Sequence, residues 1–403
     1  MKLVTGMVNM NVNTQRDLKI SYVFVFLEVF EHEGGIQSYI RQMLASYAAL
    51  NPSLKSQVFI LRDSPRSTPP IQSDALTFRY LKKQSPWLGR VQLAWELFWF
   101  LIQHRPQRVL CGHVKLLPLL SLLCEPLQIP ITVLTYGKEV WSPLPPRTQQ
   151  LLQKANSIWS ISRYSRDRSC AVNGLDAKKF ELLPCCVEGQ TFTPGPKSPK
   201  WVERYGLGDD RVLMTVARLW SGDPYKGVDV TIRALPEILK VFPNVKYLVI
   251  GRGDDQPRLA QLAQDLGLEK QVIFAGFVAN EDLVEHYRLA DAYVMPSQEG
   301  FGIVYLEAMS CGVPVISGDA DGSADPLQDG KVGWCVPHRS PEAVAAACLE
   351  ILKGGQQRCD GRWLREQALA AFSVETFTQH LGKLLELGQT APVPSLQPTP
   401  DRR

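Results

Sequence analysis

The sequence predicts two α/β domains, each a doubly wound parallel sheet, that face one another across a cleft. Three observations support this fold class. Short apolar runs rich in β-branched residues alternate with helical segments along most of the chain, as in parallel sheets whose strands are buried on both faces. The pattern stops at a proline-rich stretch over residues 191–199 and then restarts. The 403 residues also exceed the roughly 250–300 that one hydrophobic core usually holds.

The first half of the pattern contains five expected strands. The opening run, KISYVFVFL at 19–27, is apolar and is followed by a glycine loop and a helical segment over 36–49, which is how a βαβ unit begins. Further apolar runs occur at 57–61, 108–112, 131–135 and 157–162. We therefore expect an N-terminal Rossmann-like domain over residues 18–195, preceded by a flexible leader over 1–17.

The second half contains six expected strands, at 211–217, 245–250, 271–276, 292–296, 313–317 and 333–337. They predict a C-terminal domain over 196–375, followed by a separate helix over 376–390 and a disordered, proline-rich tail over 391–403. Ligands of such sheets bind beyond the carboxyl ends of the strands. Two facing sheets can therefore hold two substrates, which suits a group transfer.

Composition and charge exclude several classes of protein. The net charge of +4 is too weakly basic to indicate a nucleic-acid-binding protein. No apolar run reaches the roughly 18 residues of a membrane-spanning helix, and the N-terminus lacks the apolar core of a secretory signal. The nine cysteines form no C-x-x-C pair and the six histidines are scattered, so we expect reduced thiols, a cytoplasmic protein and no metal.

The most informative segment is MPSQEGFGIVYLEAMSCGVPVISG, residues 295–318. A strand is expected to end at its start, and a helix is expected to begin at Ile303 after a short loop. Gly300 and Gly302 in that loop free the backbone, so that amide groups at the helix N-terminus can face a ligand. Unpaired amides and the positive end of the helix dipole predict a phosphate site.

Two carboxylates, Glu299 and Glu307, flank this phosphate site. A helical path would place them on the order of 12 Å apart. That is too far for a pair of glycosidase carboxylates, which lie about 5–10 Å apart. The spacing fits one ligand with its sugar at Glu299, its diphosphate over the glycine amides and its ribose at Glu307. The alternative is a helix whose first-turn glutamate merely complements the dipole.

A second signal lies at VARLWSGDPYKG, residues 216–227. Arg218 follows directly after an expected strand, and Lys226 follows the next loop. Two cations at the mouth of a cleft suit a pyrophosphate, which arginine binds bidentately and lysine as a point charge. Either residue alone would be interpreted as a solvated surface cation.

Together these motifs resemble those of the retaining, nucleotide-sugar-dependent glycosyltransferases of the GT-B fold, glycosyltransferase family 4. The likeness is very specific over most of 211–337, where VARLW…YKG, the E-x7-E motif and AMSCGVPVI occur in the family's order. The first domain matches more weakly, at EGGIQSY (33–39), CGHVKLLPL (111–119), TYGKEVW (135–141) and ISRYSRD (161–167).

The resemblance implies a role for each matching residue of the second domain. Arg218 and Lys226 would bind the donor diphosphate, Glu307 the ribose hydroxyls, and Glu299 the donor sugar. The segment GFVAN, residues 276–280, resembles the loop whose backbone reads the base. The expected substrate-binding set is completed by Phe277, Val278, Gly300, Phe301, Gly302 and Ile303.

In the first domain, each implied role has an alternative. Gly34 and Gly35 would approach the phosphate and the acceptor, or would only form a tight turn. His113 would lie near the donor sugar and the reacting centre, or would be a capping or core histidine. Glu139 is either an acceptor contact or a surface carboxylate. Tyr136 stands where the family often carries a histidine, which puts catalytic work at that position in doubt.

Two further features bear on cofactors and partners. Asp319 and Asp321 spell a D-x-D motif, but the resemblance implies that cations and a helix dipole replace the metal, so we expect neither metal nor cofactor. The segment PWLGRVQLAWELFWFLIQ, residues 86–103, has aromatic residues at helical spacing beside Lys82, Lys83 and Arg90. We interpret it as a core helix over the sheet, with peripheral membrane contact as the alternative.

The expected function is therefore the retaining transfer of a hexose from a nucleoside-diphosphate sugar to a hydroxyl acceptor such as a glycan, lipid-linked or polysaccharide precursor. His113, Arg218, Lys226 and Glu299 are the expected catalytic residues. One rival is a non-catalytic GT-B binding relative. Another is a phosphorylase-type enzyme, which would need a Schiff-base lysine and usually a longer chain. We expect a cytoplasmic location, with association at the cytoplasmic face of a membrane left open.

Overall fold

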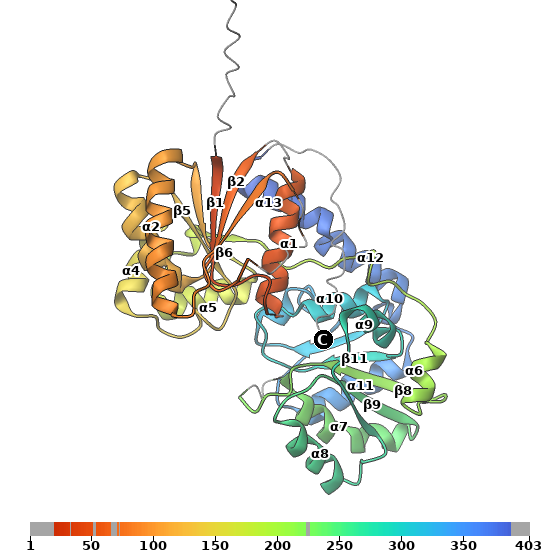
Figure 1. The fold of residues 1–403 in the computed structure, drawn as a ribbon. Coiled ribbons are helices and arrows are strands. Elements are labelled where there is room, and N and C mark those ends of the chain that lie inside the picture. Colours follow the sequence, from red (N-terminus) through yellow and green to blue (C-terminus); the bar gives the residue numbers. More distant parts are fainter. Residues whose placement is uncertain are drawn as a thin grey trace, which may run out of the picture.

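The computed structural model describes residues 20–32, 34–50, 54–65, 71, 73–222 and 226–387. The predicted leader over 1–17 and the predicted tail over 391–403 lie outside the described residues. Two parallel sheets, one of seven strands and one of six, form two α/β domains (Figure 1). The predicted fold class is therefore confirmed.

The N-terminal sheet has the strand order β3-β2-β1-β4-β5-β6-β7, and every neighbouring pair is parallel. Its strands are β1 (Ile20–Phe26), β2 (Lys55–Ile60), β3 (Leu76–Tyr80), β4 (Arg108–Cys111), β5 (Ile131–Thr135), β6 (Ser157–Ser160) and β7 (Phe180–Leu182). The helices are α1 (Gly35–Leu50), α2 (Pro86–His104), α3 (Leu117–Cys124), α4 (Pro146–Lys154) and α5 (Arg163–Asn173). The two edge strands, β3 and β7, were not predicted.

The C-terminal sheet has the order β10-β9-β8-β11-β12-β13, again parallel throughout. Its strands are β8 (Arg211–Val216), β9 (Val245–Ile250), β10 (Val272–Gly276), β11 (Ala292–Met295), β12 (Val315–Gly318) and β13 (Trp334–Val336). The helices are α6 (Pro199–Arg204), α7 (Val228–Val241), α8 (Gln256–Asp265), α9 (Asn280–Tyr287), α10 (Ile303–Ser310), α11 (Pro341–Lys353) and α12 (Gly361–Phe372).

Each sheet reverses its strand order at one place, beside β1 in the first domain and beside β8 in the second. Crevices beyond the carboxyl ends of the strands form at such reversals, and open α/β sheets bind their ligands there. Each sheet therefore has one position, at the carboxyl ends of its strands, where a ligand is expected to bind.

The last helix, α13 (Val374–Leu384), leaves the C-terminal domain and packs against α1 of the N-terminal domain (Figure 1). The Tyr22 hydroxyl donates to the carbonyl of Leu385 at 2.5 Å, just beyond this helix. The backbone N–H of Val187 donates to the carbonyl of Phe372 at 2.9 Å, so the two segments that join the domains run side by side. The expected separate helix thus completes a layer of the first domain.

Candidate active site

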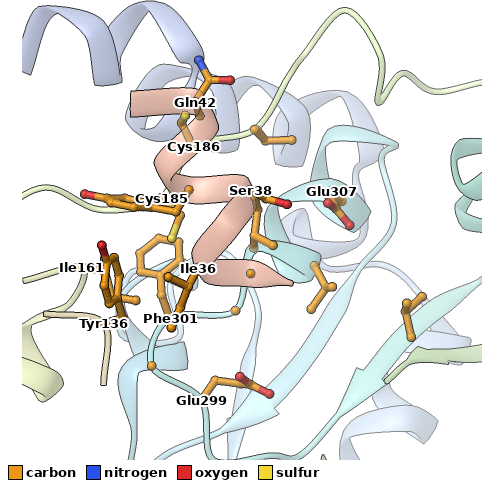
Figure 2. A pocket seen from close by; sticks show the side chains of 18 of the residues that line it. Ile36, Ser38, Gln42, Tyr136, Ile161, Cys185, Cys186, Glu299, Phe301 and Glu307 are labelled. Carbon is orange, nitrogen blue, oxygen red and sulfur yellow. The ribbon is translucent and has the colours of Figure 1, made fainter. Parts of the chain in front are cut away.

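A cavity of about 840 Å³ lies between the two domains, and residues that follow the carboxyl ends of strands in both sheets line it (Figure 2). We call it the interdomain cavity. Nine of the fourteen predicted site residues line it: Gly35, Glu139, Lys226, Glu299, Gly300, Phe301, Gly302, Ile303 and Glu307. The structure therefore brings together residues that lie far apart in the sequence.

The loop between β11 and α10 forms the C-terminal wall of the cavity. Gly302 caps α10 with a φ of 86°, a left-handed conformation that favours glycine. A Cβ on Gly300 would lie 2.4 Å from the carbonyl oxygen of Tyr136 in the other domain, so only glycine permits this approach. These two glycines let the loop backbone cross the domain interface before the helix begins.

Glu299 carries an ion pair and a backbone contact that fix its loop. Its carboxylate binds the ammonium group of Lys226, and its backbone N–H donates to the carboxylate of Asp321. Asp321 also accepts from the backbone N–H of Ser323 at 2.8 Å, and burial raises the pKa of its carboxyl to about 6. Asp321, the second aspartate of the D-x-D motif, therefore holds the glycine loop in place. Among the described residues, no cluster of histidine, cysteine, aspartate or glutamate could hold a metal ion.

Glu307 lies on α10, well separated from Glu299, and both side chains border the cavity (Figure 2). The hydroxyl of Tyr287 donates to its Oε2 atom at 2.7 Å. Burial raises the pKa of the Glu307 carboxyl to about 7, and the hydrogen bond from Tyr287 opposes that rise only in part. A carboxylate so placed gains from any ligand that donates hydroxyl groups to it.

The two predicted cations lie on different surfaces. Lys226 lines the interdomain cavity and also a small adjoining hollow. Arg218 lines that hollow but not the interdomain cavity, and its guanidinium group lies 5.2 Å from the ring centre of Trp220. The charge of Lys226 therefore reaches the cavity directly, whereas that of Arg218 acts from beside it.

The N-terminal wall is built from several separate segments. Gly35 lines the cavity at the first turn of α1, but Gly34 does not. Glu139, after β5, accepts from the backbone N–H of Tyr136 and, at 3.3 Å, from that of Gly137, while burial raises the pKa of its carboxyl. The buried Tyr136 donates to the carbonyl of Gly112 at 3.0 Å. Hydrogen bonds between these side chains and backbone groups of the same domain therefore fix this wall.

His113 follows β4 and does not line the cavity. Its Nδ1 atom accepts from the backbone N–H of Lys115 at 3.1 Å and so caps the next turn. Burial, helped by Lys115 and Arg62, lowers the pKa of its imidazole to about 4. The structure thus shows the capping contact that the sequence left open, and a catalytic role for His113 stays a prediction.

The expected base-reading loop, residues 276–280, borders the cavity only through its last residue. Asn280, Glu281 and Leu283 line it, whereas Phe277 and Val278 do not. The Phe277 ring is half exposed and lies 4.9 Å from the guanidinium group of Arg252. Sequence reasoning missed a further set of lining residues: Ser38, Arg41, Gln42, Lys138, Cys185, Cys186, Glu188 and Thr191. Of these, Ser38 and Lys138 lie within the segments EGGIQSY and TYGKEVW but were not assigned a role.

Arg163, at the N-terminus of α5, connects the domains beside the cavity. Its guanidinium group pairs with Asp325 and with Asp329, each at 2.8 Å, and both carboxylates belong to the C-terminal domain. Exposed ion pairs contribute about 0–1 kcal/mol each. This bridge therefore holds the two walls together without fixing their distance strongly. Within the described part of the chain, no helix is both long enough and apolar enough to span a bilayer.

Comparison with known proteins agrees with this geometry. The family described as Glycosyl transferases group 1 matches residues 198–361. The chain is 37% identical over 235 residues to the GDP-mannose-dependent alpha-(1-6)-phosphatidylinositol monomannoside mannosyltransferase of Mycolicibacterium smegmatis, which covers 55% of this chain and 60% of that protein. The corresponding monoacylated-substrate mannosyltransferase of Corynebacterium glutamicum is 30% identical over 265 residues, 62% of this chain and 68% of that protein.

The match therefore spans about three fifths of the length of the first of these relatives. Among solved structures, Anabaena HepE in complex with UDP superposes with a TM-score of 0.76 at 19% identity, covering 91% of this chain and 100% of that one. At that identity the likeness concerns the fold, which is the arrangement of two facing parallel sheets described above.

Proposed function

Because the chain belongs to the group 1 glycosyl transferases, we propose that it transfers a hexose from a nucleoside-diphosphate sugar to a hydroxyl acceptor, with retention of the anomeric configuration. The observation that carries this proposal is that Lys226, Glu299 and Glu307 line one interdomain cavity together with the glycine loop before α10. A cation, amide donors and two carboxylates are what a diphosphate, a sugar and a ribose require.

The names of two relatives support a more specific proposal for the donor and the acceptor. Both are named as GDP-mannose-dependent mannosyltransferases that act on phosphatidylinositol mannosides. We infer that GDP-mannose is the donor and that the acceptor is a lipid-linked glycan precursor. We propose that the enzyme acts in the cytoplasm, at the cytoplasmic face of the membrane that holds this acceptor.

The chemistry follows from where charge develops. As the bond between the anomeric carbon and the diphosphate breaks, positive charge grows on the sugar and negative charge on the leaving group. Lys226, Arg218 and the amides before α10 stabilise that negative charge. Lys226 would exchange its present partner, Glu299, for the diphosphate, which leaves the carboxylate of Glu299 to contact the sugar.

Retention is explained by attack on the same face that the diphosphate leaves. The acceptor oxygen forms its bond to the anomeric carbon, and its proton passes to an oxygen of the departing diphosphate. We favour this route over a covalent sugar–enzyme intermediate because it needs no side-chain nucleophile and leaves the Glu299 carboxylate to contact the sugar hydroxyls. In this scheme the lysine and the amides supply the charge stabilisation that a metal or cofactor would otherwise supply.

A thermal-shift panel with GDP, UDP, ADP and their sugars tests the donor assignment. A ligand at 100 times its dissociation constant adds about 2.7 kcal/mol of stability, so GDP and GDP-mannose should raise the melting temperature most. A transfer assay with a lipid-linked hydroxyl acceptor then tests turnover. If UDP compounds alone stabilise the protein, the donor assignment is wrong. If no nucleotide does, or if bound donor is never transferred, the chain is a non-catalytic relative.

A further inference from the structure

We propose that the outer face of helix α2 docks the protein on a membrane surface that carries anionic lipid. The sequence favoured a core helix for this segment, and one face of α2 does have that role. Gly89, Leu93, Leu97 and Leu101 recur every four residues and are buried, and the three leucines join the apolar cluster beneath the first sheet. We assign membrane docking to the opposite face of the helix.

That opposite face is apolar too, although it is exposed. Seven of the thirteen large apolar side chains that are exposed among the described residues lie on α2. At about 100° per residue they fall within an arc of about 120°, so they form one continuous stripe. We call this stripe the aromatic face; Trp87, Trp95 and Trp99 are 61%, 64% and 44% exposed within it. Contiguous exposed apolar patches mark interaction sites.

The charges around the aromatic face indicate the partner. Residues 79–105 contain five cations and one carboxylate. All five cations are exposed, although the ammonium group of Lys82 pairs with the Glu31 carboxylate. Glu96 is half buried and accepts a hydrogen bond from Gln92 at 2.6 Å. Indole rings beside lysine and arginine suit a bilayer interface, where the rings reach headgroup level and the cations attract anionic lipid. A second copy of this chain would meet these cations with its own, which disfavours self-association.

The position of α2 also suits such docking. The helix follows β3, so its first turn lies at the carboxyl edge of the first sheet, the edge that borders the interdomain cavity. Trp87, Lys82 and Lys83 therefore lie at the cavity end of the surface. Docking at this surface would bring a lipid-linked acceptor close to the cavity, and that benefit rests on the proposed function. The docking itself does not rest on it.

Vesicle co-sedimentation of the full chain tests the proposal. The vesicles are phosphatidylcholine with and without phosphatidylglycerol, at low and at high salt. We expect binding to the anionic vesicles, weakened by salt, and a loss of about tenfold or more in Trp95→Ser/Trp99→Ser, because each large apolar side chain contributes at least about tenfold when it leaves water. Failure of the unaltered chain to bind, or equal binding by the double variant, would overturn the proposal.

Two matched substitutions distinguish a specific effect on the aromatic face from the general effect of an added negative charge. Val91 on α2 and Val241 on α7 are 52% and 51% exposed, so Val91→Glu and Val241→Glu add the same charge to equally exposed helices. We expect only Val91→Glu to weaken vesicle binding, with melting temperatures and GDP binding retained in both. Equal losses in the two variants would reject the aromatic face as the docking site.

The remaining outcomes distinguish this inference from the proposed function. Self-association that Trp95→Ser/Trp99→Ser abolishes, without vesicle binding, would assign the aromatic face to a second copy and overturn the inference. Transfer to a water-soluble acceptor without vesicle binding overturns the docking alone. Vesicle binding by a chain that binds no nucleoside diphosphate supports the docking and rejects the proposed function.

Discussion

The two walls of the interdomain cavity come from the same kind of sheet but are assembled differently. The C-terminal wall takes most of its lining residues from one short stretch, from Gln298 through the glycine loop to Glu307 on α10, to which Lys226 and the start of α9 are added. The N-terminal wall is assembled from segments that lie far apart in the sequence: α1, the loop after β5 and the segment after β7. A site made by local spacing can be recognised in a sequence, whereas a site collected by tertiary packing cannot.

The walls also differ in how their carboxylates are satisfied. Burial raises the pKa of the Glu139 carboxyl too, but the backbone amides of Tyr136 and Gly137 donate to it and oppose that rise. Glu307 accepts a hydrogen bond from the hydroxyl of Tyr287, and burial raises the pKa of its carboxyl to about 7. The C-terminal wall therefore holds a carboxylate whose charge costs stability until a ligand binds, as is common at functional sites.

The largest expected effect is the loss of the cation on the C-terminal wall. Lys226→Ala should lower kcat/KM by about 10²–10³-fold, because a preorganised contact to developing charge contributes about 2.7–4 kcal/mol. Steady-state kinetics with varied donor measures the change. Lys240→Ala, which removes an exposed lysine from α7, is the control and should behave like the unaltered enzyme. Near-normal kinetics in Lys226→Ala would show that this wall is not where the diphosphate leaves.

The second prediction concerns the buried charge of Glu307. Its raised pKa stabilises the fold fully below the ordinary value of 4.5, and that contribution is lost as the pH rises through about 7. Glu307→Gln does not titrate, so its free energy of unfolding relative to the unaltered chain should rise by about 2–3 kcal/mol from pH 5 to pH 8. Urea unfolding at both pH values measures this, with exposed Glu366→Gln on α12 as control. A pH-independent difference would contradict the burial argument.

A third prediction divides the work of the two glutamates. Glu307→Ala should weaken GDP and the full sugar donor alike, by about 10–100-fold, since a charge-assisted contact to the ribose is lost. Glu299→Ala should spare GDP, weaken the sugar donor and depress turnover. Calorimetric titration of both variants with both ligands gives the four affinities. Equal losses for the two ligands in Glu299→Ala would reject this arrangement of the donor.

On the N-terminal wall we expect a smaller effect. His113→Ala should lower stability by about 1 kcal/mol, because the turn loses its cap. His113→Asn keeps a capping acceptor and should restore stability, but turnover should remain about tenfold lower if the imidazole contacts the donor sugar. Thermal unfolding and kcat of both variants are compared. Full activity in His113→Asn would reduce His113 to a structural residue.

The smallest expected effect is that of a chelator, which should leave turnover unchanged. In the proposed mechanism Lys226 and the loop amides oppose the leaving charge, and the Asp321 carboxylate accepts from the backbone N–H groups of Glu299 and Ser323. Assays with and without excess chelator decide the matter. Complete loss of activity that magnesium or manganese restores would move Asp319 and Asp321 to a metal site.

The sequence allowed most of the fold to be predicted, because strands buried on both faces are apolar throughout. The expected runs at 131–135 and 245–250 coincide with β5 and β9. The edge strand β3 escaped notice because its side chains alternate between buried and exposed positions, and β7 because it has only three residues. Cavity residues such as Arg41 escaped because nothing local marks which turn of α1 will face the second domain.

The return of α13 to the first domain has a consequence for biosynthesis. The ribosome makes α1 early, but α13, which packs on α1, is made near the end of synthesis. In the folded protein the ring centres of Tyr39 on α1 and Phe377 on α13 lie 5.8 Å apart, so this surface of α1 is not covered until Phe377 has been translated. Domains usually fold in the order of their synthesis. Here the domain that is synthesised first is completed last. The N-terminal domain expressed alone should therefore give a soluble fragment only when a segment containing α13 is supplied with it.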